Sequence, residues 1–132
     1  MTDLITKAKQ YSPLGLAYIG DSIYEIMVRQ KVIARGNMPV QKLHTKTIEY
    51  VCAKAQSQAI EIILPILNED EIAIYKRGRN ANANHTPKNG NPQEYRRATG
   101  LEALFGYLYL SEQTTRISEL FELIYTGKKQ DN

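Results

Sequence analysis

Apolar residues recur every three or four positions through most of this chain, which is the spacing of one buried face of an α-helix. The first run of this kind begins at Leu14 and ends at Ile33. Ser12 and Pro13 precede it, and a serine N-cap followed by a proline in the first turn is a common helix start. Gly36 follows it, and glycine readily adopts the left-handed conformation that ends many helices. The pattern predicts one long helix from Pro13 to just before Gly36.

The same spacing predicts a second helical stretch from about Val40 to Leu67. Pro65 interrupts or closes it, because proline lacks an N–H donor and clashes with the preceding turn. A short helix is expected after Asn68, since an asparagine cap followed by acidic residues suits the positive end of a helix.

Residues 78–93 break the helical pattern, because they contain Gly and Pro residues and five Asn, which together are typical of a loop. Helical spacing returns over 94–110, and again from about residue 114 to residue 125. Gly127 is expected to end the last helix and to leave a frayed tail over 127–132.

The whole chain, residues 1–132, is predicted to be a single all-α domain, because no stretch shows the alternation of a β-strand. No apolar run approaches the roughly 18–20 residues that span a bilayer, and the N-terminal residues lack the apolar core of a signal peptide. The single Cys52 cannot form an internal disulfide and is expected to be a small core residue. We therefore expect a cytoplasmic protein with no zinc site and no membrane segment.

Positive charge is concentrated in one segment, residues 76–97, which contain six Lys or Arg and one Glu. Residues 1–75 carry equal numbers of basic and acidic side chains, so the chain's net charge of +3 comes from this segment. A focused basic segment is typical of a protein that binds a polyanion, nucleic acid first. The alternative is a solvated loop with a chance cluster of charges.

Asp21 lies inside the first predicted helix, between Gly20 and Ser22. One interpretation is a kink between two helical pieces, because Ser22 and Glu25 have the spacing of a capping box. The other is a continuous helix, which the unbroken apolar spacing favours. In that case the carboxylate lies at the edge of the apolar face, where a charge needs a partner or a metal ion.

Glu102 has the same unusual setting within 94–110, among small and apolar neighbours. One interpretation is a core carboxylate paired with Arg96, Arg97 or a tyrosine hydroxyl. The other is a ligand, together with Asp21, for a divalent metal ion. Carboxylate oxygens suit Mg²⁺, which keeps several waters and needs few protein ligands. The two acids flank the basic segment in the sequence, which favours the metal site.

Two motifs resemble the catalytic signature of the ribonuclease III family. They are the run LAYIGDS over 16–22 and the run LEALFGYLYL over 101–110. Each motif alone is weak, but their order, separation and helical context agree with the family. The chain is more closely similar to the short bacterial Mini-III branch, through further motifs that include LHTKT, KRGRNA and TPKN. The resemblance covers nearly all of residues 14–125.

The resemblance implies an all-helical endonuclease domain that acts as a homodimer on double-stranded RNA. It places Asp21 and Glu102 on the catalytic acids of the family, which bind Mg²⁺, with Mn²⁺ as a substitute. Cleavage is expected to leave 5′-phosphate and 3′-hydroxyl ends. The implied substrate in this branch is the precursor of 23S ribosomal RNA, with a ribosomal protein as a candidate partner that presents it.

Ordinary members of the family carry further acids at the positions of Ala17 and Thr99, so a site with four carboxylates is not expected here. Mini-III members share this smaller set. The missing acids also favour an alternative function, a catalytically silent module that binds double-stranded RNA or the ribosome.

The basic segment is the expected RNA-binding surface, because the chain ends soon after the second motif and a separate RNA-binding domain is expected to be absent. Lys and Arg bind phosphates with little dependence on sequence, and Asn and His suit contacts with 2′-hydroxyls. Arg77 and Arg79 are the strongest candidates, whereas Arg96 and Arg97 suit ion pairs within the fold equally well. The residues expected to bind RNA are Lys76, Arg77, Arg79, Asn80, His85, Lys88, Arg96 and Arg97.

Overall fold

The computed structural model describes residues 2–81 and 90–130 of the chain. These residues form seven α-helices and one 3-10 helix, and the described part contains no strand. The elements are α1 (Thr2–Gln10), α2 (Pro13–Ile33), α3 (Val40–Val51), α4 (Ala53–Ile63), η1 (Leu64–Ile66), α5 (Glu69–Ala81), α6 (Pro92–Leu110) and α7 (Thr114–Gln130). The predicted all-α class is confirmed. None of the described helices is both long and apolar enough to cross a membrane.

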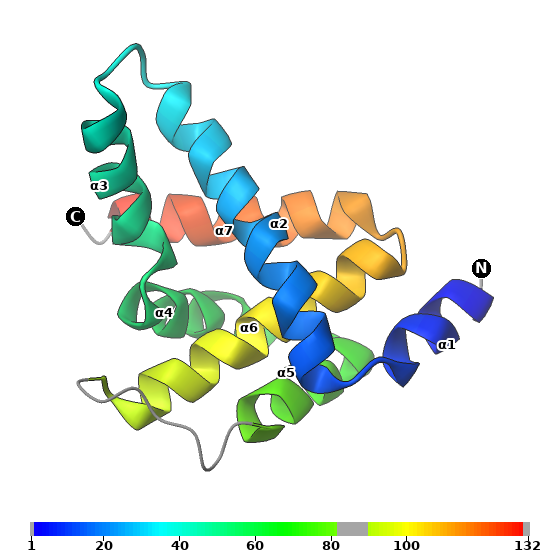
Figure 1. The fold of residues 1–132 in the computed structure, drawn as a ribbon. Coiled ribbons are helices and arrows are strands. Elements are labelled where there is room, and N and C mark those ends of the chain that lie inside the picture. The colour runs from blue at the N-terminus through cyan, green and yellow to red at the C-terminus, as the bar shows by residue number, and fades with distance from the viewer. Residues whose placement is uncertain (1, 82–89, 131–132) are drawn as a thin grey trace.

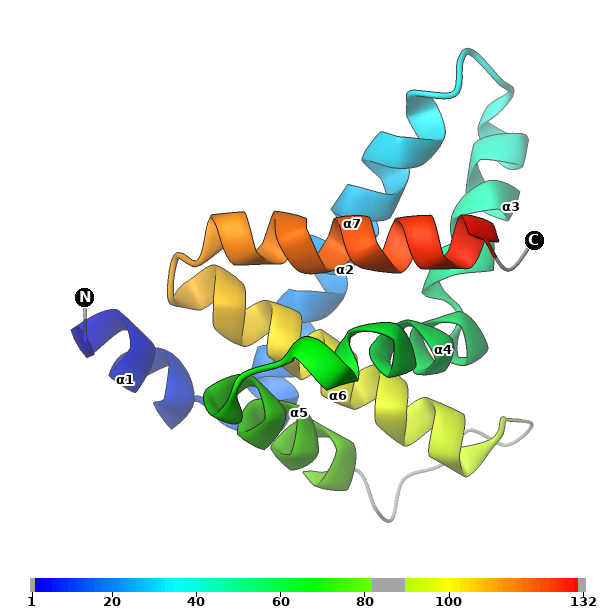
Figure 2. The ribbon, with the colours of Figure 1, turned by 180° about the vertical axis from the view of Figure 1, so that it is seen from behind.

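The central helix of the fold is α6. From Ala98 to Leu108 every residue of α6 is buried except Glu102. A helix that is covered all round needs small or apolar residues on every face, which this stretch supplies. In Figure 1, α2 crosses α6 near the middle of the molecule, and α7 passes behind α2 above this crossing. Figure 2 shows α7 running across the opposite face, above α4 and α5.

The hydrophobic core lies where α2, α4, α6 and α7 meet. Tyr24 of α2 packs edge-on against Phe105 of α6 and Phe121 of α7, with ring centroids 5.2 and 5.7 Å apart. Edge-to-face packing is favourable because the positive edge of one ring meets the negative face of another. Other fully enclosed side chains include Leu16, Ile60, Ile63, Leu101, Leu104, Leu108 and Leu120.

The long helix predicted at the start of the chain is confirmed as α2. The Oγ atom of Ser12 accepts a hydrogen bond from the N–H of Gly15 at 3.0 Å, which caps the helix. Beyond the last turn, Gly36 adopts a φ of 128°, which side chains rarely tolerate. The helix runs without interruption through Asp21. The continuous-helix interpretation is therefore right, and the kink is wrong.

The stretch predicted as one helix over 40–67 is two helices, α3 and α4, separated at Cys52. The backbone of Cys52 is extended, with φ −66° and ψ 157°. The sequence contains no Gly or Pro at this break, so the apolar spacing does not reveal it. Pro65 has the expected effect, because it lies in the 3-10 helix that ends this region. The expectation of a buried Cys52 is wrong, since its side chain is exposed.

Both ends of the chain are more helical than predicted. α1 is not among the elements that the apolar spacing predicts, and its end is held by α5. α7 continues past Gly127 to Gln130, so Gly127 does not end the helix, and the expectation that 127–130 are frayed is wrong. A Cβ atom added to Gly127 would meet only the far end of the Ile62 side chain of α4, so this glycine interrupts neither the helix nor its packing.

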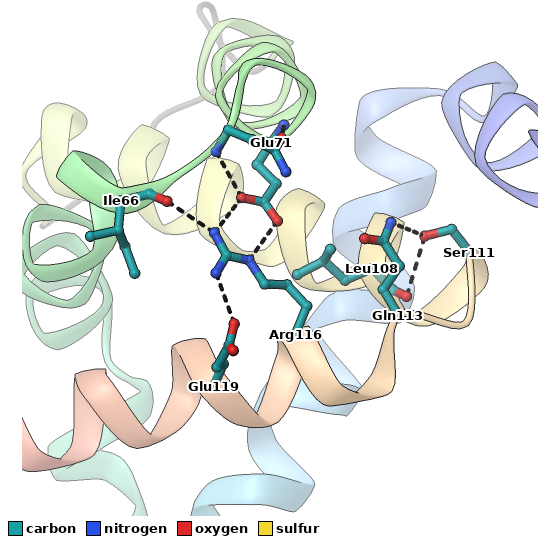
Figure 3. Close-up of polar contacts among 8 residues, drawn as sticks. Ile66, Glu71, Leu108, Ser111, Gln113, Arg116 and Glu119 are labelled. Atoms are coloured by element: carbon teal, nitrogen blue, oxygen red, sulfur yellow. Dashed lines mark hydrogen bonds and ion pairs between the residues drawn. The ribbon is translucent and has the colours of Figure 1, made fainter.

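The short helix after Asn68 is confirmed as α5, although it continues to Ala81, so the loop predicted to start at residue 78 begins too early. The helix begins with a capping box. The Oδ1 atom of Asn68 accepts from the N–H of Glu71, and a carboxylate oxygen of Glu71 accepts from the N–H of Asn68, both at 2.9 Å. The Glu71 carboxylate is only 1% exposed and also accepts two hydrogen bonds of 2.8 Å from Arg116 (Figure 3). This network joins the start of α5 to α7.

Candidate active site

α2 and α6 are in direct backbone contact where they cross. A Cβ atom added to Gly20 would overlap the carbonyl oxygen of Glu102, and one added to Gly106 would overlap the carbonyl oxygen of Leu16. The two glycines therefore let the helices approach more closely than side chains normally permit. This contact sets Asp21, which follows Gly20, beside Glu102.

The two acids occupy different environments at the crossing. Asp21 is exposed on α2, whereas Glu102 is half-buried on α6. The carboxyl group of Asp21 lies close enough to that of Glu102 to act on its ionisation. The fold thus brings together the two carboxyl groups that the sequence motifs single out. Arg97 pairs with Glu61 and Gln56 donates to Glu102, so the predicted pairing of Glu102 with Arg96 or Arg97 is wrong.

The environment of Glu102 favours the neutral form of its carboxyl group. Burial has the largest effect, and the charge of Asp21 adds to it, whereas a hydrogen bond from Gln56 acts in the opposite direction. Together they raise the pKa of Glu102 from 4.5 to about 8. A cation beside both groups would remove this repulsion, because opposite charge favours the ionised form.

Gln56 of α4 is a site residue that the sequence analysis misses. Its Nε2 atom donates to a carboxylate oxygen of Glu102 at 3.3 Å and to the carbonyl oxygen of Val51 at 3.0 Å. Gln56 is only 2% exposed. It occupies the same helical face as the buried Ala59, Ile60 and Ile63. A polar residue within this apolar stripe is the signal that identifies it.

The donor set fits a hydrated divalent cation such as Mg²⁺. The two carboxylates supply the hard oxygen ligands that this ion prefers. Across the described residues there is no cluster of three or more Asp, Glu, His or Cys that could hold a metal ion. Ala17 and Thr99 are both buried. They occupy the positions where ordinary members of the resembled family have two further acids. Mg²⁺ usually retains several waters, so two protein carboxylates are sufficient.

Residues 14–113, which contain both acids, match the family described as Ribonuclease III domain. The chain belongs to the ribonuclease III family. A protein of Thermoanaerobacter sp. (strain X514) named Mini-ribonuclease 3 is 47% identical over 124 residues, which are 92% of this chain and 87% of that protein. A Clostridium tetani protein of the same name is 49% identical over 117 residues, which are 88% of this chain and 78% of that protein.

Among solved structures, a crystal structure of a Fusobacterium nucleatum protein is similar, with a TM-score of 0.81 and 30% identity. The similarity covers 90% of this chain and 95% of that one. The helical fold is thus the ribonuclease III type, as the resemblance implied. The family match and the similar Mini-ribonuclease 3 proteins together show that this chain is a ribonuclease III-type endoribonuclease of the Mini-III kind.

Glu25 is a further acid near this ribonuclease III site, and it has an ion-pair partner on its own helix. It lies one turn beyond Asp21 on α2, and its carboxylate accepts a hydrogen bond of 2.9 Å from Arg29, one turn further along. This pair accounts for the charge of Glu25 without a capping box. Asp21 and the Glu25–Arg29 pair border an open hollow of about 350 Å³ on the exposed side of α2.

Two basic residues of the ribonuclease III chain already have partners within the fold. The guanidinium group of Arg77 donates to the carbonyl oxygens of Lys9 and Tyr11 at 3.0 Å each, which holds the end of α1 against α5. Arg97 of α6 pairs with Glu61 of α4 at 3.1 Å. These contacts explain both charges without RNA, although they do not prevent a phosphate contact.

Of the basic residues predicted to bind RNA, Arg79, Arg96 and Arg97 lie together where the end of α5 meets the start of α6. Arg79 lies over the ring of Tyr75, with 5.6 Å between its guanidinium carbon and the ring centroid. Lys76 and Asn80 are exposed on α5. An open hollow of about 260 Å³ lies here, lined by Arg79, Gln93, Arg96 and Arg97. His85 and Lys88 lie outside the described residues.

Proposed function

We propose that this chain is a divalent-metal-dependent endoribonuclease that cleaves double-stranded RNA, with Asp21 and Glu102 as its catalytic metal ligands. The observation that carries this proposal is the glycine-mediated crossing, which forces two carboxyl groups together at the one unburied position in the middle of α6. Adjacent carboxylates disfavour one another without a cation, so their pairing indicates a metal site rather than a stabilising contact.

Each residue of the site has a separate role in the proposed reaction. Asp21 and Glu102 hold the metal, Mg²⁺ or Mn²⁺, through their carboxylate oxygens. When bound, the ion supplies an activated water and stabilises the charge on the leaving 3′ oxygen. The products are then a 5′-phosphate and a 3′-hydroxyl. Because Asp21 is exposed, an RNA strand laid along α2 can reach the site from solvent.

The hollow between α5 and α6 is the proposed phosphate-binding surface. Arg96 precedes Glu102 by six positions on the same helix, which corresponds to about 9 Å along its axis. A cationic surface at this separation suits the backbone of a duplex whose cleaved phosphate lies at the acids. The residues proposed to contact RNA are Lys76, Arg77, Arg79, Asn80, His85, Lys88, Arg96 and Arg97.

The active form is proposed to be a homodimer in which each protomer cuts one strand. Four large apolar side chains of α2 support a second copy as the partner, because they are 45–82% exposed along the helix that carries Asp21. They are Leu14, Tyr18, Ile26 and Ile33. The proposed substrate is the precursor of 23S ribosomal RNA in the cytoplasm, with a ribosomal protein that presents it.

The decisive experiment compares the native chain with Asp21→Asn on a long labelled duplex RNA in Mg²⁺. This nearly isosteric change removes one metal ligand and one charge. Cleavage by the native chain alone is expected. If neither protein cuts any duplex in Mg²⁺ or Mn²⁺ while both bind it equally, the chain is instead an RNA-binding module, which the absence of acids at Ala17 and Thr99 favours.

A further inference from the structure

We propose that Gln56 is a positioning residue for the metal site. Its amide N–H orients the Glu102 carboxylate for metal binding, and its amide oxygen accepts a hydrogen bond from a water molecule of the site. The inference rests on the proposed function, since it assigns Glu102 as a metal ligand. It concerns a side chain on α4, whereas both acids belong to the α2–α6 crossing.

The orientation of the Gln56 amide is determined by its two acceptors. Nε2 has a carboxylate oxygen of Glu102 at 3.3 Å and the carbonyl oxygen of Val51 at 3.0 Å. The backbone carbonyl oxygen of Val51 can only accept, so an amide oxygen in that position would have no donor there and the nitrogen must face it. Both N–H bonds of the amide are therefore used, one of them on Glu102.

The break at Cys52 explains why a glutamine occupies this position. α3 ends at Val51, whose carbonyl oxygen lies among the last acceptors of that helix and lacks a partner further along it. Gln56 lies in the first turn of α4, and its side chain reaches back to supply that donor. The same side chain then reaches Glu102 of α6. One residue thus connects the junction of two helices to the acid on a third.

The carbonyl oxygen of Gln56 provides a second, independent observation. Of the buried side-chain nitrogen and oxygen atoms in the described residues, only this Oε1 atom has no hydrogen-bond partner. Buried polar atoms are nearly always satisfied, and an exception at a site indicates a missing water or ion. Covalent geometry keeps this oxygen close to the nitrogen that touches Glu102. Water in the shell of a hydrated cation would satisfy it.

These contacts restrain Glu102 where the neighbouring acid would otherwise displace it. Asp21 repels an ionised Glu102, and the flexible glutamate side chain would turn away to relieve that repulsion. A fixed N–H donor on the other side opposes this movement and favours the ionised ligand. Second-shell partners of this type typically contribute 10–100-fold to metal affinity.

The test is Gln56→Met, which keeps the length of the side chain and removes both polar atoms, with Gln58→Met as the matched control on the exposed side of α4. Metal affinity is measured directly, by titrating each protein with Mn²⁺ and observing the free ion by electron paramagnetic resonance. We expect the Gln56 variant to bind Mn²⁺ about 10–100-fold more weakly than the native chain, and the control to bind it normally. Cleavage should recover at high metal concentration, with KM for duplex RNA unchanged.

Equal Mn²⁺ affinity in the native chain and Gln56→Met would overturn the inference, as would a raised KM with unchanged metal affinity. If Gln56→Met does not fold, Gln56→Asn is tested in its place. The shorter asparagine side chain cannot reach both the Val51 carbonyl oxygen and the Glu102 carboxylate. It should also weaken Mn²⁺ binding, and native affinity in that variant would equally exclude the role. A native chain that neither binds Mn²⁺ nor cuts duplex RNA would instead refute the proposed function.

Discussion

The half-buried Glu102 is the residue whose protonation links the site to pH. Its pKa is raised to about 8 by burial and by the adjacent Asp21. In the metal-free folded chain it therefore keeps a proton between about pH 4.5 and 8, whereas the unfolded chain loses that proton above its ordinary value of 4.5. Because the folded state binds more protons in this window, the free energy of unfolding falls as pH rises.

With a chelator present to remove metal ions, we expect the melting temperature to decrease from about pH 5 to pH 8. Part of this decrease is due to the proton that Glu102 keeps only in the folded state. Glu102→Gln should flatten that decrease, while the same change at the exposed Glu49 should leave it intact. Mg²⁺ should raise the melting temperature more at pH 8 than at pH 6, because the metal binds the ionised carboxylate. Thermal denaturation followed by circular dichroism measures both effects. Identical pH profiles for Glu102→Gln and the native chain would contradict this account.

The three residues of the site differ in how far the sequence reveals them. Asp21 and Glu102 interrupt apolar helical faces and lie in motifs that resemble a known family, so both could be predicted. Gln56 interrupts a similar face on α4, but a buried amide is common in a helix–helix contact. Only the hydrogen bond from Gln56 to Glu102, seen in the structure, distinguishes this glutamine from an ordinary buried amide.

At the level of elements, the α2–α6 crossing depends on Gly20, and Gly20→Ala tests it. The added methyl group meets backbone atoms of Glu102 that cannot move aside, so the helices must separate. We expect a loss of about 1–3 kcal/mol in the free energy of unfolding, measured with urea. Cleavage of duplex RNA should fall about 100-fold, because displaced acids no longer share one metal.

Gly127→Ala is the matched control for this change. Its nearest neighbour is the end of the flexible Ile62 side chain, which can rotate away, and alanine favours the helix. Stability and cleavage should both stay near native. Native cleavage in Gly20→Ala would mean that the close crossing is not required for the site.

The helices differ in how well local spacing predicts them. α2 has a serine cap, a proline start and a terminal glycine, so its span follows from the sequence. The junction at Cys52 has none of these signals. The side chain of Gln56 bridges this junction by donating to the carbonyl oxygen of Val51, and apolar spacing does not report such a side-chain contact.

For the whole molecule, the exposed apolar residues of α2 predict a dimer. Ile26→Asp should shift the native particle toward a monomer at micromolar concentration, because a charge would be buried without a partner in the interface. Leu123→Asp is the control, since Leu123 is similarly exposed (46% against 51%) but lies on α7. Light scattering measures the mass. A native chain that is already monomeric would contradict the dimer.

The basic hollow between α5 and α6 predicts salt-dependent RNA binding. In the cleavage-deficient Asp21→Asn background, Arg96→Gln should weaken duplex binding and reduce the slope of log affinity against log salt by about 1. Lys7→Gln removes an equal charge from the exposed side of α1 and should leave the slope unchanged. Titrations at several salt concentrations provide the measurement. Equal slopes for Arg96→Gln and the native background would remove Arg96 from the RNA surface.

The sequence alone determined the all-α class, the span of α2, the basic segment and the two acids, because each is expressed in the spacing or type of nearby residues. Tertiary structure alone decided that Gly20 and Gly106 form the crossing, that Gln56 touches Glu102, and that Arg77 holds the end of α1. These are contacts between segments far apart in the chain. Local periodicity states which face of a helix is buried, whereas the packing of the complete fold selects the partner that covers it.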